Sequence, residues 1–317
     1  MDNKKFIPVF KPSLSFKNKF DVFKSVLKSE ISGTSPIIKE FEQNLSKTFD
    51  RKHVVTVSNG SVALDLALKS LNLTENDEVI IPSFTIISCL SAVVRTGATP
   101  VFCDVDPLTW CMTLDDVKNK VTDKTKAIIV VHTYGLPAEV QKIEKYCVDN
   151  NISLIEDAAE AHGIMVNKRP CGSFGKISTM SFYANKHITA GEGGAVLTDD
   201  TQIFKELIQM RNLDFRADSR FKHDNLYWNY RMGGIQAALG NSQIKNLEKT
   251  INFKIKQGNY YQHLLSGNSE LLQLPIKNTG ENTNHYWVFG ILLKKSNIKD
   301  RVIKELQELN IQTRPFF

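Results

Sequence analysis

The sequence predicts an α/β fold with a mostly parallel sheet in a large domain, followed by a small C-terminal α/β domain. Apolar segments typical of strands alternate with amphipathic segments typical of helices through the first two thirds of the chain. One segment, residues 127–131, is apolar throughout, as expected of a central parallel strand covered on both faces. The 317 residues, 42% of them hydrophobic, suffice for about two domains and exclude a wholly disordered chain.

The expected elements follow one another at a regular cadence. Residues 62–71 form a well-buried helix, because Leu64, Ala67 and Leu68 belong to one broad apolar face. The other elements expected in this part of the chain are strands at 78–81, 99–103, 127–131 and 153–155 and a helix at 137–150.

The pattern changes after about residue 236. The expected elements there are a long helix at 236–261, a strand at 286–293, an amphipathic helix at 299–309 and a short segment at 311–314. We therefore predict a large domain at residues 1–240 and a small domain at 241–317. One helix and two strands are too few to close a sheet, so we expect the small domain to be incomplete and the chain to be truncated.

Composition limits the class of protein. The longest apolar runs are far shorter than the roughly 20 residues of a membrane helix, and the N-terminal segment lacks the apolar stretch of a secretory signal. Five scattered cysteines without a Cys-x-x-Cys pair indicate no disulfide framework and no metal site, and favour a reducing, cytoplasmic location. The net charge of +6 comes from dispersed lysines, which favours a small anionic ligand over a nucleic acid.

Open α/β sheets bind ligands beyond the carboxyl ends of their strands, and four segments there carry candidate residues. The first, residues 57–61, is a turn of small polar residues that ends in Gly60 and Ser61 and begins a helix. Such a turn exposes backbone N–H groups at the positive end of the helix dipole and can bind phosphate. Ordinary helix capping by Ser58, Asn59 or Ser61 is the alternative interpretation.

The second segment, residues 155–163, ends an apolar strand on acidic residues. The Asp157 carboxylate is placed to pair with a ligand cation or a ring N–H, although capping of a helix explains it equally well. In the third segment, residues 179–196, short strands flank Lys186 and a glycine-rich turn. A lysine held there can lose its proton and act as an amine nucleophile, although most lysines are simply solvated.

The fourth segment, residues 227–232, gathers aromatic and polar side chains before a helix, and can also be a packed loop with Asn229 as its turn residue. Each segment is a weak signal alone. Together, a phosphate-binding turn, an acid at a strand end and a lysine in a glycine-rich turn match the needs of pyridoxal phosphate. That cofactor requires a lysine Schiff base, a carboxylate on its ring nitrogen and an anchored phosphate.

The chain resembles the DegT/DnrJ/EryC1/StrS family of sugar aminotransferases, which are fold-type I pyridoxal-phosphate enzymes acting on nucleotide-linked keto sugars. The resemblance covers nearly the whole sequence, and the lysine-to-glycine segment is its most specific part. It rests on residues 7–8, 58–64, 77–82, 97–102, 131–135, 155–163, 181–198, 229–232 and 313–315.

The resemblance implies roles for the cofactor-binding residues. Lys186 is expected to form the Schiff base, and Asp157 to pair with the pyridinium nitrogen. Glu160 stands near the ring hydroxyl, where the family often has Gln. The phosphate is expected to be held by Gly60, Ser61 and Ser181. Related enzymes add Asn229 from the neighbouring subunit, which implies a homodimer with shared active sites.

Within the family, the segments Asn185-Lys186, His285-Tyr286-Trp287 and Thr313-Arg314-Pro315 are most similar to GDP-perosamine synthases. This similarity implies transfer of an amino group from glutamate to C4 of GDP-4-keto-6-deoxymannose, for O-antigen lipopolysaccharide and other cell-surface polysaccharides. The candidate contacts to the sugar nucleotide are Arg231, His285 and Arg314.

Three alternatives stay open: an aminotransferase for a UDP- or dTDP-linked keto sugar, a cofactor-dependent sugar dehydratase, and a non-catalytic truncated member. The dehydratases have histidine in the place of Lys186, so the lysine favours amination. The chain departs from the family at Ile86, where many relatives have an aromatic residue that stacks on the cofactor ring. The family also continues beyond Arg314-Pro315, which supports the expected truncation.

Overall fold

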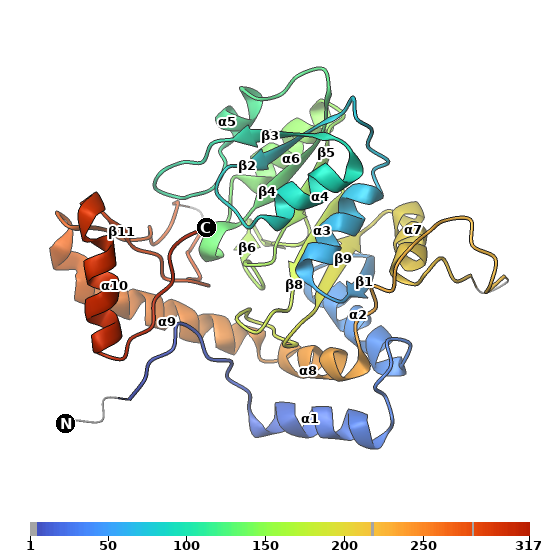
Figure 1. Ribbon diagram of the computed structural model, residues 1–317, viewed down its shortest axis with the longest axis horizontal. Helices are drawn as coiled ribbons and strands as arrows, with labels where there is room; N and C mark the ends of the chain where they lie inside the picture. The colour runs from blue at the N-terminus through green and yellow to red at the C-terminus, as the bar shows by residue number, and fades with distance from the viewer. Residues whose placement is uncertain (1–4, 217–218, 281) are drawn as a thin grey trace.

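A computed structural model of the chain describes residues 5–216, 219–280 and 282–317 (Figure 1). Its centre is a seven-stranded sheet with the strand order β1-β9-β8-β5-β4-β2-β3. The strands are β1 (His53–Val57), β2 (Glu78–Pro82), β3 (Thr99–Cys103), β4 (Thr125–Val131), β5 (Ser153–Asp157), β8 (Ile177–Ser181) and β9 (Gly194–Thr198). Only the two pairs that β9 makes, with β1 and with β8, are antiparallel, so the predicted mostly parallel sheet is confirmed.

The strand β4 occupies the centre of the parallel part, between β5 and β2, as its apolar sequence predicts. Its side chains alternate between two hydrophobic clusters, one on each face of the sheet: Ile128 belongs to the first and Ile129 to the second. The first face is covered by α2 (Pro36–Thr48), α5 (Leu114–Lys118), α6 (Val140–Asp149) and α8 (Gly234–Ile244). The second is covered by α3 (Gly60–Lys69), α4 (Ser88–Thr96) and α7 (Thr201–Arg211).

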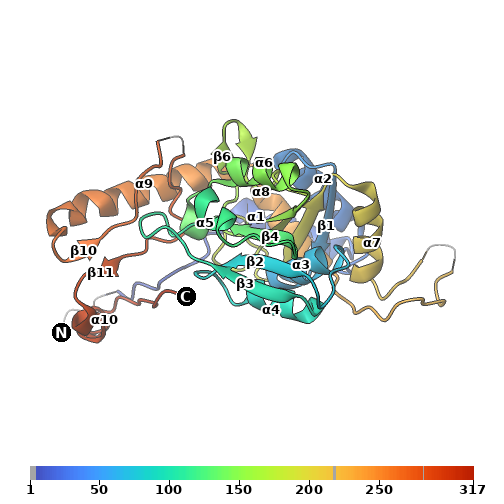
Figure 2. The ribbon, with the colours of Figure 1, turned by 90° about the horizontal axis from the view of Figure 1, so that it is seen from above.

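The remaining elements lie mostly at the edge of this core, to which Val166, Leu247 and Ile251 still belong. Helix α1 (Phe16–Leu27) packs on α8, and β6 (Met165–Val166) pairs with β7 (Arg169–Pro170). Helix α9 (Leu247–Leu265) leads away from the sheet to the short pair β10 (Leu272–Gln273) and β11 (Leu292–Leu293) and to α10 (Lys299–Glu308), as Figures 1 and 2 show. Single 3-10 turns are η1 (Thr133–Gly135), η2 (Ser266–Asn268) and η3 (Ser296–Ile298).

The C-terminal third agrees with the sequence prediction only in part. The helix expected at 299–309 is confirmed as α10, whereas the single helix expected at 236–261 is wrong, because the chain breaks between α8 and α9. Asn246 has φ −108° and ψ 7°, which redirects the chain after α8. This break lets α8 pack against α1 and α2 while α9 extends outward (Figure 1).

The strand expected at 286–293 is also wrong, except for β11 at its end. Tyr286 has φ 49°, a left-handed conformation that no strand contains. Its N–H donates to Asn284 Oδ1 at 2.7 Å, and the N–H of His285 donates to the carbonyl of Gly135 at 2.8 Å. The segment therefore docks on the turn after β4 instead of pairing with another strand.

Two segments near the opposite ends of the chain lie side by side. Ile7 forms a parallel bridge with Ile311, with hydrogen bonds of 2.8 and 2.9 Å. Residues 1–4, which begin the segment that lacks a secretory pattern, lie outside the described residues. Among the residues that the structure describes, no helix has both the length and the apolar character needed to cross a membrane.

Candidate active site

The carboxyl ends of β4, β5 and β8 bring the predicted site residues together, as the parallel sheet requires. The loop after β8 carries Lys186 and is closed by backbone hydrogen bonds. Phe182 N–H donates to the Gly193 carbonyl at 2.8 Å, and Lys186 N–H donates to the Tyr183 carbonyl at 2.9 Å. This closed loop fixes the backbone of the lysine.

The Lys186 amine is buried beside two carboxyl groups. Its Nζ lies 3.6 Å from Glu160 Oε1, and the two side chains are only 10% and 9% exposed. Burial lowers the pKa of Lys186, while the charges of Glu160 and Asp157 oppose that shift. A lysine with a lowered pKa is more often neutral, and the neutral amine is the nucleophile.

Asp157 ends β5 and is buried with few donors around it. The backbone N–H of Ala159 donates to its Oδ1 at 3.0 Å, and Cys89 Sγ lies 3.8 Å from its Oδ2. Burial raises the pKa of Asp157 and also that of the Cys89 thiol, which therefore stays protonated and is the donor in this contact. A protonated ring nitrogen placed here would supply the positive partner that the carboxylate lacks.

Glu160 is held by the turn after β4. The Tyr134 N–H donates to Glu160 Oε2 at 2.8 Å, and Tyr134 itself has φ 56°. Burial raises the pKa of Glu160 to about 7. Near neutral pH this carboxyl can therefore either donate or accept a hydrogen bond.

The predicted phosphate-binding turn forms the start of α3. Asn59 caps the helix, with its Oδ1 accepting from Val62 N–H at 2.9 Å, so the capping interpretation is correct and leaves Gly60 and Ser61 at the first helical positions. A Cβ at Gly60 would lie 2.8 Å from Ser181 Cβ, so only glycine allows this approach. The Ser61 hydroxyl lies 2.7 Å from that of Ser88, a residue that sequence reasoning missed.

These groups fit pyridoxal phosphate. The helix start with its serine hydroxyls suits a phosphate, because the first N–H groups of a helix have no partner within the helix. The buried amine of Lys186 suits an aldehyde, and the poorly satisfied carboxyl of Asp157 suits a pyridinium nitrogen.

An aromatic cluster beside Lys186 was not predicted. It consists of Trp110, Tyr134 and Trp287, with Phe84 and Phe316 packed against them. The face of Trp287 covers the Lys186 amine, and its Nε1 donates to the Asn185 carbonyl at 2.9 Å. The strand expected at 286–293 would not place Trp287 over the lysine, so the sequence predicts no role for this residue in the site. Ile86, expected near the ring face, is 42% exposed.

A second unpredicted cluster supports the ends of β4 and β5. His132 Nε2 lies 2.8 Å from Glu156 Oε1, and His132 Nδ1 accepts from Ala138 N–H at 3.2 Å. The same glutamate also accepts from the N–H groups of Gly172 and Phe174. With Cys171 nearby, His132 and Glu156 form a group of side chains of the kinds that bind metal ions. The atoms of His132 and Glu156 that would bind a metal are, however, engaged in these hydrogen bonds.

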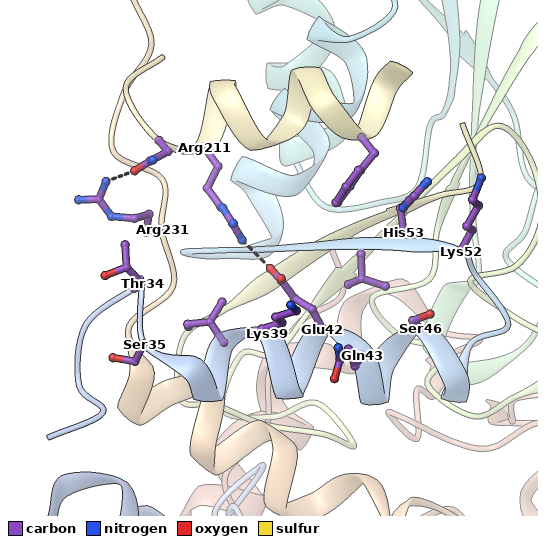
Figure 3. Close-up of a pocket in the computed structure, with 15 residues that line it drawn as sticks. Thr34, Ser35, Lys39, Glu42, Gln43, Ser46, Lys52, His53, Arg211 and Arg231 are labelled. Atoms are coloured by element: carbon purple, nitrogen blue, oxygen red, sulfur yellow. Dashed lines mark hydrogen bonds and ion pairs between the residues drawn. The ribbon is translucent and has the colours of Figure 1, made fainter. Parts of the chain in front are cut away.

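Two predicted residues, Asn229 and Arg231, make their hydrogen bonds with residues other than Lys186 in the structure. Asn229 is exposed, and its Oδ1 accepts from the Arg231 N–H at 3.2 Å. Arg231 donates to Asn212 and lines a pocket of about 440 Å³ between α2 and α7. Figure 3 shows this pocket, which the ion pair between Arg211 and Glu42 crosses.

The other two substrate candidates lie at the edge of the site. Burial lowers the pKa of His285 to about 4, and its Nδ1 has no hydrogen-bond partner among the described residues. Arg314 is exposed, with its guanidinium 5.2 Å from the centre of the Phe10 ring. The Phe10 ring in turn lies 6.3 Å from that of Tyr183, in the lysine loop.

Comparisons with known proteins agree with this geometry. Residues 15–317 match the DegT/DnrJ/EryC1/StrS aminotransferase family. A GDP-perosamine synthase of Escherichia coli O157:H7 is 37% identical over 313 residues, which cover 99% of this chain and 85% of that protein.

Solved structures show the same fold. The aminotransferase TlmJ of Streptoalloteichus hindustanus superimposes with a TM-score of 0.91 and 26% identity, over 98% of this chain and 85% of that one. An E. coli GDP-4-keto-6-deoxy-D-mannose-3-dehydratase with bound hydrated PLP gives a TM-score of 0.90 and 25% identity, with coverage of 98% and 85%. The match to the family over nearly the whole sequence, together with the buried lysine and carboxyl groups at the strand ends, shows that this chain belongs to the DegT/DnrJ/EryC1/StrS aminotransferase family.

Proposed function

We propose that this chain is a pyridoxal-phosphate-dependent aminotransferase that transfers the amino group of glutamate to C4 of GDP-4-keto-6-deoxymannose. The observation that carries the proposal is the buried Lys186 amine, 3.6 Å from Glu160 and within the electrostatic influence of Asp157. The nucleotide sugar follows from the relatives named GDP-perosamine synthase, at 37% and 35% identity.

The cofactor and the residues around it have separate roles in the reaction. When bound, pyridoxal phosphate supplies an electron sink for the electron pair that a breaking C–H bond leaves behind. Asp157 keeps a proton on the ring nitrogen, and the start of α3 binds the phosphate. Lys186 Nζ takes up and returns the proton that moves during transfer, and its lowered pKa keeps more of the amine in the neutral form that can accept a proton.

Glu160 orients the ring from the side of its hydroxyl. Its proton, with a pKa of about 7, allows the carboxyl to serve as donor or acceptor there. The side chains of Trp287 and Tyr134 close the site against water on the side of the C-terminal region.

The active enzyme is a homodimer with shared sites. Asn229 and Arg231 make their hydrogen bonds with residues other than Lys186 in one protomer and would reach the phosphate and substrate of the other. The segment before Asn229 exposes two large apolar side chains, Leu226 at 95% and Trp228 at 68%. Exposed apolar side chains of this size mark a protein interface, and a second copy would cover them. Figure 2 places residues 219–230 on the opposite side of the sheet from α9 and α10.

The sugar nucleotide would bind at the edge formed by His285 and Arg314, with Arg231 supplied by the partner subunit. Guanidinium groups suit the diphosphate of the substrate. The product would serve the synthesis of O-antigen or another cell-surface polysaccharide. All five cysteines are free and buried, which suits work in a reducing cytoplasm.

A panel of nucleotide-linked 4-keto sugars tests the proposal. The purified protein is incubated with pyridoxal phosphate, glutamate and GDP-, UDP- or dTDP-linked sugars, and products are identified by mass spectrometry. We expect an amino sugar from the GDP-linked substrate. An amino product from a UDP- or dTDP-linked sugar alone would correct the substrate, and loss of water without amination would identify a dehydratase.

The first prediction concerns a variant in which Lys186 is replaced. Lys186→Ala should abolish amino transfer and the covalent attachment of pyridoxal phosphate, because it removes the buried amine that lies beside Glu160 at the strand ends. Attachment is measured as the mass gained after borohydride reduction. Lys176→Ala, at the opposite end of β8, is the control and should retain both properties. Amino transfer by the Lys186 variant would contradict the assignment.

A further inference from the structure

Trp287 places the face of its indole ring over the Lys186 amine. The Nζ atom lies 3.6 Å from the ring centroid and also 3.6 Å from Glu160 Oε1. The ring is 9% exposed, so little water separates it from the amine. A cation within about 6 Å of an aromatic face is attracted to the ring, and more strongly where water is excluded.

Both the indole ring and the backbone of Trp287 are held in place. Its Nε1 donates to the carbonyl of Asn185, the residue before the lysine, at 2.9 Å. The backbone of Trp287 packs closely on Gly135, where a Cβ would lie 2.6 Å from the backbone N of Trp287. The ring of Tyr134 lies 6.1 Å from the indole ring and closes the cluster. The position of Trp287 is therefore tied both to the lysine loop and to the turn after β4, which also holds Glu160.

We propose that Trp287 is a positioning residue for Lys186, and that its ring face holds the free amine as an ammonium ion beside Glu160 during the reaction. This inference rests on the proposed function, in which the lysine amine must be free of the cofactor while it moves a proton. A free lysine side chain has several rotatable bonds and needs a defined resting place to return the proton to one atom.

The charged groups around Lys186 act in opposite directions. Glu160 and Asp157 favour the ammonium ion, whereas His162 and His187 would oppose it when protonated. Burial lowers the pKa of both histidines, so both are neutral near pH 7 and the ring of Trp287 is left to oppose desolvation together with the two carboxyl groups. Removal of the ring face should leave the amine neutral over a wider pH range.

The test measures how fast the apoprotein captures pyridoxal phosphate as a function of pH. Only the neutral amine adds to the aldehyde carbon, and one water leaves as the C=N bond forms. The midpoint of the rate profile therefore reports the titration of the amine. We expect Trp287→Leu to move this midpoint to lower pH by about half a unit to one unit. Trp287→Phe keeps a ring face but loses the indole N–H, so it should move the midpoint less.

Trp110→Phe is the matched control. Trp110 belongs to the same aromatic cluster, but among the described residues it is Trp287 whose ring covers the Lys186 amine. The substitution of Trp110 should therefore leave the midpoint unchanged. If Trp287→Leu does not fold, Trp287→Met provides a second side chain without a ring. Circular dichroism establishes that each variant is folded.

The outcomes separate the two proposals. A midpoint shared by wild type and a folded non-aromatic variant would overturn the role of Trp287, as would an equal shift in Trp110→Phe. A wild-type chain that captures no pyridoxal phosphate would instead overturn the proposed function. Reduction with borohydride and mass analysis locate the captured group on Lys186.

Discussion

At the scale of single residues, the site depends on buried carboxyl and amine groups whose pKa values are shifted by burial. Glu160 has its pKa raised to about 7 by burial, and its neighbour Lys186 has its pKa lowered by burial. The charge of each group compensates in part for the free-energy cost of burying the other. The two groups therefore differ from an ordinary ion pair at a protein surface. A ligand that binds between Glu160 and Lys186 therefore changes the pKa of both groups.

Replacement of Glu160 should change the pH dependence of stability. Its pKa rises from 4.5 to about 7 on folding, so the neutral carboxyl stabilises the folded state fully below about pH 4.5, and this contribution is lost as the pH rises through about 7. Glu160→Gln is neutral throughout. Between pH 5 and pH 8, the Tm of the wild-type apoprotein should fall by a few degrees relative to that of the variant.

Thermal unfolding at several pH values checks this expectation. Glu192→Gln, a substitution at an exposed position after Gly191, is the control and should follow the wild type. Parallel curves for wild type and Glu160→Gln would show that the carboxyl is not held neutral by burial.

At the scale of elements, the turn after β4 connects the sheet to the C-terminal region. In this turn the N–H of Tyr134 donates to the Glu160 carboxyl, and the carbonyl of Gly135 accepts from the N–H of His285. The segment that carries Trp287 therefore takes its position from the sheet, although it follows α9 by many residues. This docking explains why residues 286–291 form no strand.

Gly135→Ala should loosen this docking. Gly135 has φ +92°, and a Cβ there would lie 2.6 Å from Trp287 N and 3.1 Å from Tyr286 N, both of them backbone atoms that cannot move alone. We expect a loss of about 2–4 kcal/mol in the free energy of unfolding and a change in tryptophan fluorescence. Denaturant unfolding followed by fluorescence measures both.

Gly97→Ala is the control that separates the cost of the left-handed backbone from the cost of the steric clash at Gly135. Gly97 has φ +88°, but a Cβ there would meet no atom within 4 Å, so this substitution carries only the cost of the left-handed backbone, about 1–2 kcal/mol. Equal losses for the two variants would mean that the contact of Gly135 with the Trp287 segment contributes nothing.

At the scale of the whole molecule, the proposed dimer makes each active site from two chains. Lys186→Ala and Asn229→Ala should each be weak or inactive alone, because each lacks one contributor to both sites. After the two variants are mixed, unfolded together and refolded, heterodimers gain one site with both residues intact. Up to about a quarter of wild-type activity should return, since half of the dimers are mixed and each has one good site.

The rate of product formation, together with the molecular mass by light scattering, measures this recovery. Refolding of each variant with itself is the control. No recovery in a mixture that contains dimers would place Asn229 outside the partner's site.

Much of the fold could be predicted because its signals are local. The strands β2, β3, β4 and β5 were expected within two residues of their observed ends, since apolar runs bounded by turn residues report burial directly. The break between α8 and α9 was missed, because both helices have helix-forming sequences and only packing against α1 and α2 separates them. The division into domains at residue 240 stays a prediction.

The sequence by itself determined the class of fold and the chemistry at the strand ends. A lysine in a glycine-rich turn and an acid at the end of a strand are patterns within short segments, and a parallel sheet brings such ends to one edge. Only the tertiary structure decided that Trp287 covers the lysine, that Glu160 titrates near pH 7, and that Arg231 lies in another pocket. These properties depend on burial and on contacts between residues that lie from 19 to 102 positions apart, and no local pattern encodes them.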